Sequence, residues 1–211
     1  MRQRLSGGRR GPNLSLPAPA VRRAAASCIV AAAAFGIAGV GAAPAATPAA
    51  FRWLVPRAAP SGWKHLSPAS GGAVMWYPPS LSRIKSDPAS VSVAQKDRSG
   101  RIAVYLNATP KEGNQESVAT WPAFRIQHNR GEDGRVRLHA QAVGLRFLGG
   151  GRGSCVIDDY TTRVIVHHYE EIACFVQGRT SAGVIVAAAL QSDWPRAVAL
   201  LERAVSAYRV D

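Results

Sequence analysis

The chain has 211 residues, with 26 Lys plus Arg against 13 Asp plus Glu and a net charge of +13. That length suits one domain with a sizeable buried core. The basic residues are scattered rather than gathered in a run with interleaved aromatic residues, which argues against a nucleic-acid-binding protein. The positive charge favours no more than loose association with an anionic membrane surface.

Residues 1–45 are predicted to be a signal peptide. A basic region without acidic residues comes first, and an apolar run of Ala, Gly and a few larger residues follows at 24–43. Small residues then form an A-x-A site that ends at Ala45, so cleavage is expected near Ala45 or Ala46. The protein is therefore predicted to be secreted or extracytoplasmic.

The apolar run leaves a second interpretation open. Its length of about twenty residues is enough to span a bilayer, so an uncleaved membrane anchor is the alternative. Ala and Gly dominate the run and contribute little per residue to insertion, which favours cleavage. Cys28 opens the run, whereas a lipidated cysteine would follow it. Cys28 is therefore interpreted as part of the leader.

The remaining chain is divided into a linker and one domain. Residues 46–60 are rich in Pro and Ala and are predicted to be a flexible linker, and residues 61–211 a single domain. Alternating apolar positions and turn residues predict a strand-rich pattern with one internal helix at 114–131, interrupted or restarted at Trp121-Pro122. The expected strands are 62–66, 73–78, 90–95, 101–109, 135–149 with a bulge at Gly144, 154–160, 169–177 and 183–190.

The last strand and the C-terminal segment indicate how the layers pack. The strand 183–190 is apolar on both faces, so it is expected at the centre of the sheet with both faces covered. A helix follows, with Ser192 as its expected cap and Pro195 in its first turn. Its apolar residues recur at helical spacing, as a stripe that packs on the sheet. The predicted fold class is α+β, a twisted and mainly antiparallel sheet with helices on both faces.

Four segments resemble exported actinobacterial proteins of the PsbP-like α/β/α sandwich superfamily. They are "GWKHLSP…AVMWYPPSL", "YLNATPKEGNQES", "SCVIDDYTTRV…YEEIACFVQG" and "VIVAAALQSDW…LLERAV". The superfamily includes an extrinsic photosystem subunit, a Ran-binding nuclear protein and actinobacterial lipoproteins, mostly with non-enzymatic roles. The resemblance implies the sandwich fold over nearly the whole domain. It carries over no functional residue, because no catalytic motif is shared across the group.

Cys155 and Cys174 are predicted to form a disulfide between neighbouring strands. Two cysteines in an exported domain favour one bridge, and the sequence between them is nearly a mirror image. An antiparallel pair with the cysteines opposite each other places Asp159 opposite Glu170 and Asp158 opposite Glu171. Facing carboxylates need a cation, from Arg163, Arg179 or another basic residue, or a shared proton. Otherwise the register is offset by two residues and the disulfide is diagonal.

The same polar segment raises the question of a catalytic or metal site. A small metal-dependent hydrolase would use the cluster of Asp158, Asp159, His168 and Glu170. The neighbouring histidines point to opposite faces of a strand, and solvated strand ends explain the carboxylates more simply. No metal, cofactor or catalytic residue is therefore predicted.

The aromatic residues suggest where a small molecule would bind. Trp63, Trp76 and Tyr105 are the candidates for lining a ligand pocket. The favoured function is an exported, non-enzymatic binding or accessory domain at the cell envelope, with an envelope protein or component as its partner. The alternatives are the metal-dependent hydrolase and a secreted carrier of a small apolar ligand.

Overall fold

The computed structural model describes residues 47–211. The expected signal peptide, residues 1–45, and its cleavage point near Ala45 or Ala46 lie outside this range. Within residues 47–211, no helix has the length and apolar character needed to cross a bilayer.

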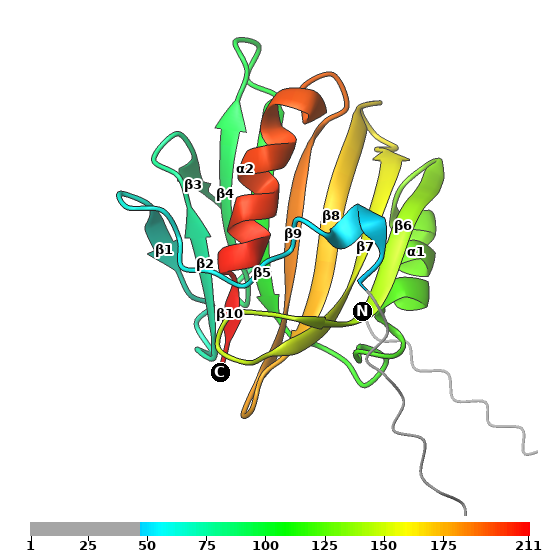
Figure 1. The fold of residues 1–211 in the computed structure, drawn as a ribbon. Coiled ribbons are helices and arrows are strands. Elements are labelled where there is room, and N and C mark those ends of the chain that lie inside the picture. The colour runs from blue at the N-terminus through cyan, green and yellow to red at the C-terminus, as the bar shows by residue number, and fades with distance from the viewer. Residues whose placement is uncertain (1–46) are drawn as a thin grey trace, which may run out of the picture. The chain divides into compact units, whose positions relative to one another are not determined.

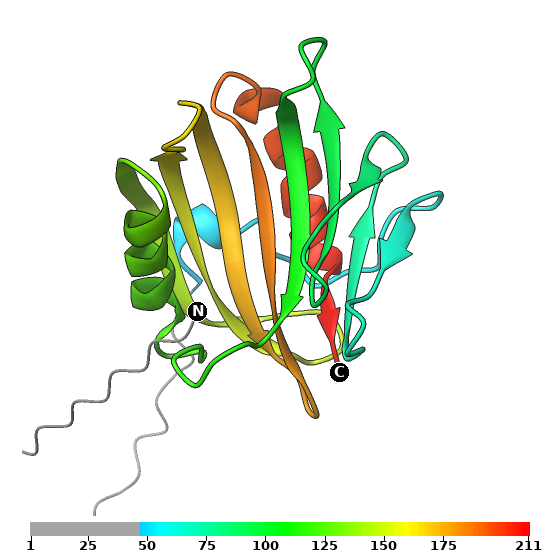
Figure 2. The same ribbon diagram turned by 180° about the vertical axis from the view of Figure 1, so that it is seen from behind.

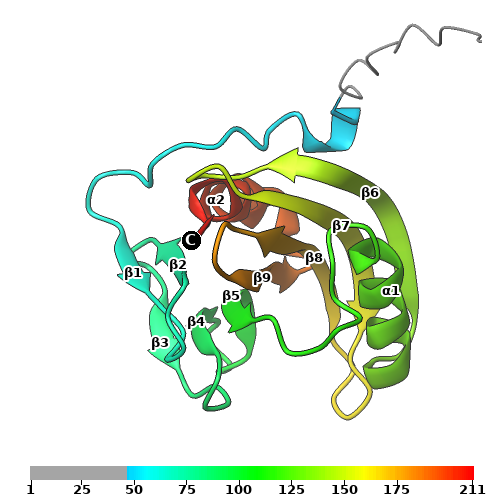
Figure 3. The ribbon, with the colours of Figure 1, turned by 90° about the horizontal axis from the view of Figure 1, so that it is seen from below.

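A seven-stranded antiparallel sheet forms the centre of the fold (Figure 1). The middle strand is β9, as its two-sided apolar sequence predicts, and all but the first of its residues are buried. The sheet is strongly curved when it is seen along its strands (Figure 3). In spatial order its strands are β3 (Ser82–Ile84), β4 (Val91–Lys96), β5 (Ile102–Pro110), β9 (Ala182–Leu190), β8 (His168–Gln177), β7 (Arg152–Thr161) and β6 (Val136–Arg146).

A second sheet of three short strands lies beside the first. Its order is β1 (Lys64–Leu66), β2 (Ala73–Tyr77) and β10 (Arg209–Val210). Sequence reasoning found β1 and β2 but missed β3 and β10. The last strand returns the C-terminus to β2, where Val210 pairs with Ala73.

Each face of the large sheet carries one helix, which confirms the predicted arrangement. On one face α2 (Trp194–Ala207) packs with Leu201 and Val205 in the main core. On the other face α1 (Trp121–Glu132) places Trp121 against Phe175 in a smaller cluster. The two helices lie on opposite sides of the strands in Figures 2 and 3. Alternation along each strand separates the side chains of the two clusters.

The helix boundaries differ from the prediction in three places, although the start of α1 coincides with the restart expected at Trp121-Pro122. Residues 114–120 form turns, and α1 begins at Trp121, so Pro122 lies in the first turn, where its missing N–H is no loss. The helix runs through Gly131 instead of ending there. At the start of α2 the cap position is Asp193, not Ser192, and Arg196 donates a hydrogen bond of 2.6 Å to the Asp193 carboxylate.

The segment expected to be a linker, 46–60, lies within the described residues from position 47 on, and part of it packs on the domain. The short 3-10 helix η1 (Ala49–Phe51) brings the Phe51 side chain into the main core, where it is fully buried. Trp53 and Leu54 pack against the same core. Packing on the core therefore starts ahead of the predicted domain boundary at residue 61. The Pro- and Ala-rich composition of this segment did not indicate that Phe51 anchors it to the core.

The β7–β8 hairpin has the register that its mirrored sequence predicts. Cys155 lies opposite Cys174, and the two form a disulfide with Cα atoms 4.1 Å apart. The direct pairing confirms the predicted bridge and excludes the diagonal alternative. Both facing carboxylate pairs are therefore present. In β6 the predicted bulge at Gly144 is confirmed by a shift of register and a φ of 76°.

Candidate functional site

The face of the large sheet that carries α1 is only partly covered. The helix packs on β6, β7 and β8, and the strands β4 and β5 stand clear of it in Figure 2. The result is a groove of about 670 Å³. Tyr105, Asn107 and Val186 line its floor, while Phe124 and the β5–α1 connection, residues 111–120, line its sides.

Neutral polar side chains are linked by hydrogen bonds along this floor. The Tyr105 and Ser92 hydroxyls are 3.2 Å apart, and Asn107 Nδ2 donates to Ser92 Oγ over 3.0 Å. Thr109 Oγ1 donates to Asn107 Oδ1 over 2.8 Å and lies 3.0 Å from Ser90 Oγ. Burial raises the pKa of Tyr105, so its hydroxyl stays neutral. These floor residues can thus both donate and accept hydrogen bonds without presenting a charge, while Asp87, Glu112 and Arg125 also line the groove.

The connection beside the groove is shaped by its own hydrogen bonds. The buried carboxylate of Glu116 accepts a hydrogen bond of 2.8 Å from the backbone N–H of Glu112. The indole Nε1 of Trp121 donates to the carbonyl of Ala173 in β8 over 3.0 Å. These bonds fix the start of α1 and with it the distance between the helix and the open strands.

A buried group of charged residues lies under α1. Asp158 of β7 and Glu171 of β8 face each other, and both are fully buried. Arg125 of α1 binds Glu171 through two hydrogen bonds of 2.8 Å, from Nε to Oε1 and from Nη2 to Oε2. Asn129, one helical turn later, donates from Nδ2 to Asp158 Oδ2 over 3.0 Å and to Glu171 Oε1 over 3.1 Å.

The two carboxyl groups carry one charge between them. Burial, the Glu171 charge and a hydrogen bond with Glu171 raise the pKa of Asp158 to about 8. Burial also opposes ionisation of Glu171, but the charge of Arg125 and hydrogen bonds from Arg125, Asn129 and Asp158 outweigh it and lower the pKa of that carboxyl. At neutral pH, Glu171 is therefore the carboxylate partner of Arg125, while Asp158 keeps its proton. The Arg125 cation and the proton retained on Asp158 relieve the repulsion between the facing carboxyl groups.

The second facing pair, Asp159 and Glu170, lies on the opposite face of the strands. Its partner is His139, which stands in the β6 bulge between Leu138 and Ala140. The His139 Nε2 and Asp159 Oδ2 atoms are 2.6 Å apart, and the side chains are 32% and 22% exposed. Burial raises the pKa of Glu170. Solvent reaches this pair, unlike the first.

The four residues of the hydrolase hypothesis do not meet at one site. Asp158 faces α1 and is bound by Asn129. Because side chains alternate along a strand, the other three, Asp159, His168 and Glu170, lie on the opposite face. Within the described part of the chain, no three His, Cys, Asp or Glu side chains are grouped to hold a metal ion.

The three aromatic residues of the pocket hypothesis also lie in different places. Tyr105 lines the groove. Trp76 lies against His65, with ring centroids 4.8 Å apart, and lines a separate cavity of about 340 Å³. Trp63 is partly buried against the main core.

Sequence reasoning missed Arg125 and Asn129, which bring the charged group together. It expected the cation for the facing carboxylates to come from Arg163, Arg179 or another basic residue, and Arg125 is that other residue. Arg163 instead donates to backbone carbonyls of Arg130 and Asp133. The available signal was the spacing of four residues between Arg125 and Asn129, which places both on one face of a helix. A helix face with an arginine and an asparagine can bind the excess carboxyl groups of the hairpin.

No protein-family model matches the chain, and no curated protein sequence matches it. Among solved structures, the cyanobacterial PsbP (CyanoP) of Synechocystis sp. PCC 6803 is similar at 14% identity, with a TM-score of 0.52, over 72% of this chain and 94% of that chain. The Saccharomyces cerevisiae Ran-binding protein Mog1p has 8% identity and a TM-score of 0.47, over 70% of this chain and 95% of that chain.

LpqN, involved in cell envelope biogenesis of Mycobacterium tuberculosis, has 13% identity and a TM-score of 0.33, over 72% of this chain and 80% of that chain. Identities this low bear on the fold alone. The match to CyanoP, together with the sheet order and the helix on each face, shows that this chain has the PsbP-like α/β/α sandwich fold.

Proposed function

We propose that the chain is an exported, non-enzymatic binding or accessory domain of the cell envelope, and that the groove beside α1 is its binding site. The observation that carries the proposal is the half-covered sheet face. One end of the face is closed by α1, and the other is a groove with an ordered, neutral, hydrogen-bonding floor. Concave sites with an apolar lining and a few placed polar groups are where ligands bind.

The groove suits a partner that offers neutral hydrogen-bonding groups and some apolar surface. Tyr105 and Asn107 supply the polar floor, and Phe124 and Val186 the apolar lining. Arg125 also borders the groove, but its guanidinium is engaged by Glu171 and is a poor anion receptor. A peptide segment of an envelope protein meets this description.

Export is supported by two features of different kinds. The disulfide between Cys155 and Cys174 is a bond that persists in oxidising compartments. The basic, apolar and small-residue order of residues 1–45 is typical of a signal peptide.

The test is photo-crosslinking in the native host with a photoreactive phenylalanine analogue. Placed at Phe124, it faces the groove. The matched control is the same analogue at Val55, an apolar side chain that is 54% exposed and outside the groove. We expect a discrete envelope adduct from position 124 and none from position 55.

Other results would redirect the proposal. Adducts of equal yield from both positions would show non-specific contact. No adduct from position 124, combined with turnover of a substrate by purified protein, would overturn it in favour of an enzyme. A small apolar molecule retained by purified protein in native mass spectrometry would favour the carrier alternative.

A further inference from the structure

The tip of the β7–β8 hairpin exposes three consecutive aliphatic side chains. Val164, Ile165 and Val166 are 96%, 67% and 66% exposed. Single exposed apolar residues are common on protein surfaces, but a run of three at a projecting turn is an exposed patch that needs a reason. The tip projects from one end of the large sheet in Figure 1, in gold.

The tip is held in place by hydrogen bonds on both sides of the aliphatic residues. The backbone N–H of Thr162 donates to the carbonyl of His167 over 3.0 Å, and the Thr162 hydroxyl accepts from the N–H of His167 over 3.0 Å. The same hydroxyl donates to the carbonyl of Ile165. Arg163 donates to the Asp133 carbonyl over 2.5 Å and the Arg130 carbonyl over 3.0 Å. The fold therefore presents the apolar side chains instead of leaving them on a loose loop.

Basic residues surround this tip. Arg163 adjoins Val164, and its bonds tie the turn to the end of α1, where Arg130 is exposed. Arg135 is exposed as well, and its backbone N–H donates to Thr161 at the base of the turn. Arg101, from the β4–β5 hairpin, lines a cavity with Val166 and His167.

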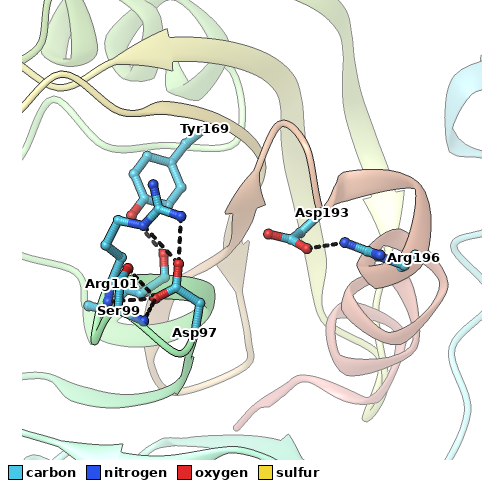
Figure 4. Close-up of polar contacts among 7 residues, drawn as sticks. Asp97, Ser99, Arg101, Tyr169, Asp193 and Arg196 are labelled. Atoms are coloured by element: carbon cyan, nitrogen blue, oxygen red, sulfur yellow. Dashed lines mark hydrogen bonds and ion pairs between the residues drawn. The ribbon is translucent and has the colours of Figure 1, made fainter.

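The nearby acidic residues are fewer. Asp97 is paired with Arg101 at 2.7 Å, as Figure 4 shows. Glu132 and Asp133 follow Arg130 at the end of α1, and burial is the main cause that raises the pKa of Asp133. With Arg101 paired to Asp97, the remaining Arg130, Arg135 and Arg163 stand against Glu132 and Asp133, which leaves a small excess of positive charge about a protruding apolar point.

We propose that the tip of the β7–β8 hairpin, residues 163–167, inserts its aliphatic side chains into the surface of an anionic lipid bilayer while the surrounding arginines bind lipid headgroups. A protein interface normally buries about 800 Å² on each side, over twenty or more residues. Three residues on a convex turn are too few for that. They match a membrane interface, which needs apolar side chains a short way into the headgroup region and basic residues beside them.

The test uses residues 47–211, which lie within one compact unit and exclude the apolar run at 24–43. Ile165→Cys carries an environment-sensitive fluorophore, read on vesicles of phosphatidylglycerol and phosphatidylcholine. The matched control is the fluorophore on Thr180→Cys, which is exposed in the hairpin at the other end of β8. We expect a blue shift at position 165 with anionic vesicles, a weaker one with phosphatidylcholine alone, and none at position 180.

Two variants separate the apolar and the basic contributions. With the probe kept at 165, Val164→Ser/Val166→Ser should raise the vesicle concentration for half of the shift by about tenfold, because two aliphatic insertions are lost. Arg130→Gln/Arg135→Gln, which leaves the Arg163 hydrogen bonds to the turn in place, should raise it by about tenfold at low salt and less at high salt. Both pairs are exposed, so an unchanged thermal midpoint serves as the folding control.

The proposal fails if the probe at 165 shows no shift with anionic vesicles, or shifts no more than the probe at 180. It also fails if position 165 responds to an envelope protein and not to lipid, which would make the tip a protein contact. The groove plays no part in these measurements, so their failure leaves the proposed function untouched.

Discussion

Two neighbouring pairs of carboxylates on the same two strands have opposite surroundings. Asp158 and Glu171 are fully buried under α1 and depend on Arg125 and Asn129. The adjacent pair, Asp159 and Glu170, lies on the other face, reaches solvent and has His139 as its partner. Because side chains alternate along a strand, a shift of one residue exchanges a low-dielectric setting for a solvated one.

The comparison predicts which of the two pairs determines stability. A buried charge left without its partner is costly, whereas an exposed ion pair contributes little. The first pair is therefore expected to be sensitive to substitution and to pH, and the second to be nearly indifferent. The predictions below run from the largest expected effect to the smallest.

Arg125→Met is expected to have the largest effect. It removes the cation from a fully buried Glu171, and losing one partner of a buried pair costs about 3–5 kcal/mol of the free energy of unfolding. Urea denaturation of the variant and the parent measures the difference. The matched control is Arg196→Met, whose pair with Asp193 (Figure 4) is exposed, so a change below about 0.5 kcal/mol is expected.

Adding Glu171→Gln to Arg125→Met should recover part of the lost stability, because the unpaired charge is then gone. Equal losses of the free energy of unfolding in Arg125→Met and Arg196→Met would contradict the prediction, because the buried pair would then stabilise the fold no more than an exposed one.

Removing the disulfide is expected to be the next largest change. Cys155→Ala/Cys174→Ala opens a loop between residues 19 apart in sequence, and a loop of that length is associated with about 3 kcal/mol. The variant should still fold, because the core is much larger than the bridge. Denaturation with and without reductant checks both points: the parent should be sensitive to reductant and the variant insensitive. A parent that yields two alkylated thiols without reductant would contradict the bridge.

The stability of the protein should fall as the pH rises from about 5 to 8. The folded state keeps the Asp158 proton up to a pKa of about 8, whereas the unfolded state releases it near 3.8. The folded state therefore binds more protons in this window, and stability falls by up to about 1.4 kcal/mol per pH unit. Denaturation midpoints across this range measure the slope.

Asp158→Asn should remove that slope, because the amide remains neutral at every pH. Asp159→Asn is the matched control one residue away and should keep the slope. On the acid side, the lowered pKa of Glu171 acts in the opposite direction, and stability is lost as the pH falls through it. A slope that survives Asp158→Asn would show that another group titrates.

His139→Ala is expected to have the smallest effect. The His139 and Asp159 side chains are partly exposed, so their interaction contributes less than about 1 kcal/mol to the free energy of unfolding. The same denaturation measurement applies, with Arg125→Met as the sensitive reference. A loss as large as that of Arg125→Met would remove the distinction between the two faces.

Sequence alone predicted the local features of this protein. The mirrored pattern around Cys155 and Cys174 predicted the hairpin register, the bridge and the opposition of carboxylates. The two-sided apolar strand 183–190 predicted its central place, and helical spacing predicted α2. Each of these rests on contacts between residues close in sequence, or on a period of 2 or 3.6 that a short segment can show.

Tertiary structure decided everything that depends on where α1 lies. Arg125 and Asn129 reach Glu171 from 46 and 42 residues away. The sequence of the hairpin does not identify which distant residues bind its carboxyl groups. The same helix covers only part of its face, which leaves the groove with Tyr105 open. The size of the groove depends on how much of the sheet face one helix covers. That is determined only when distant elements pack together.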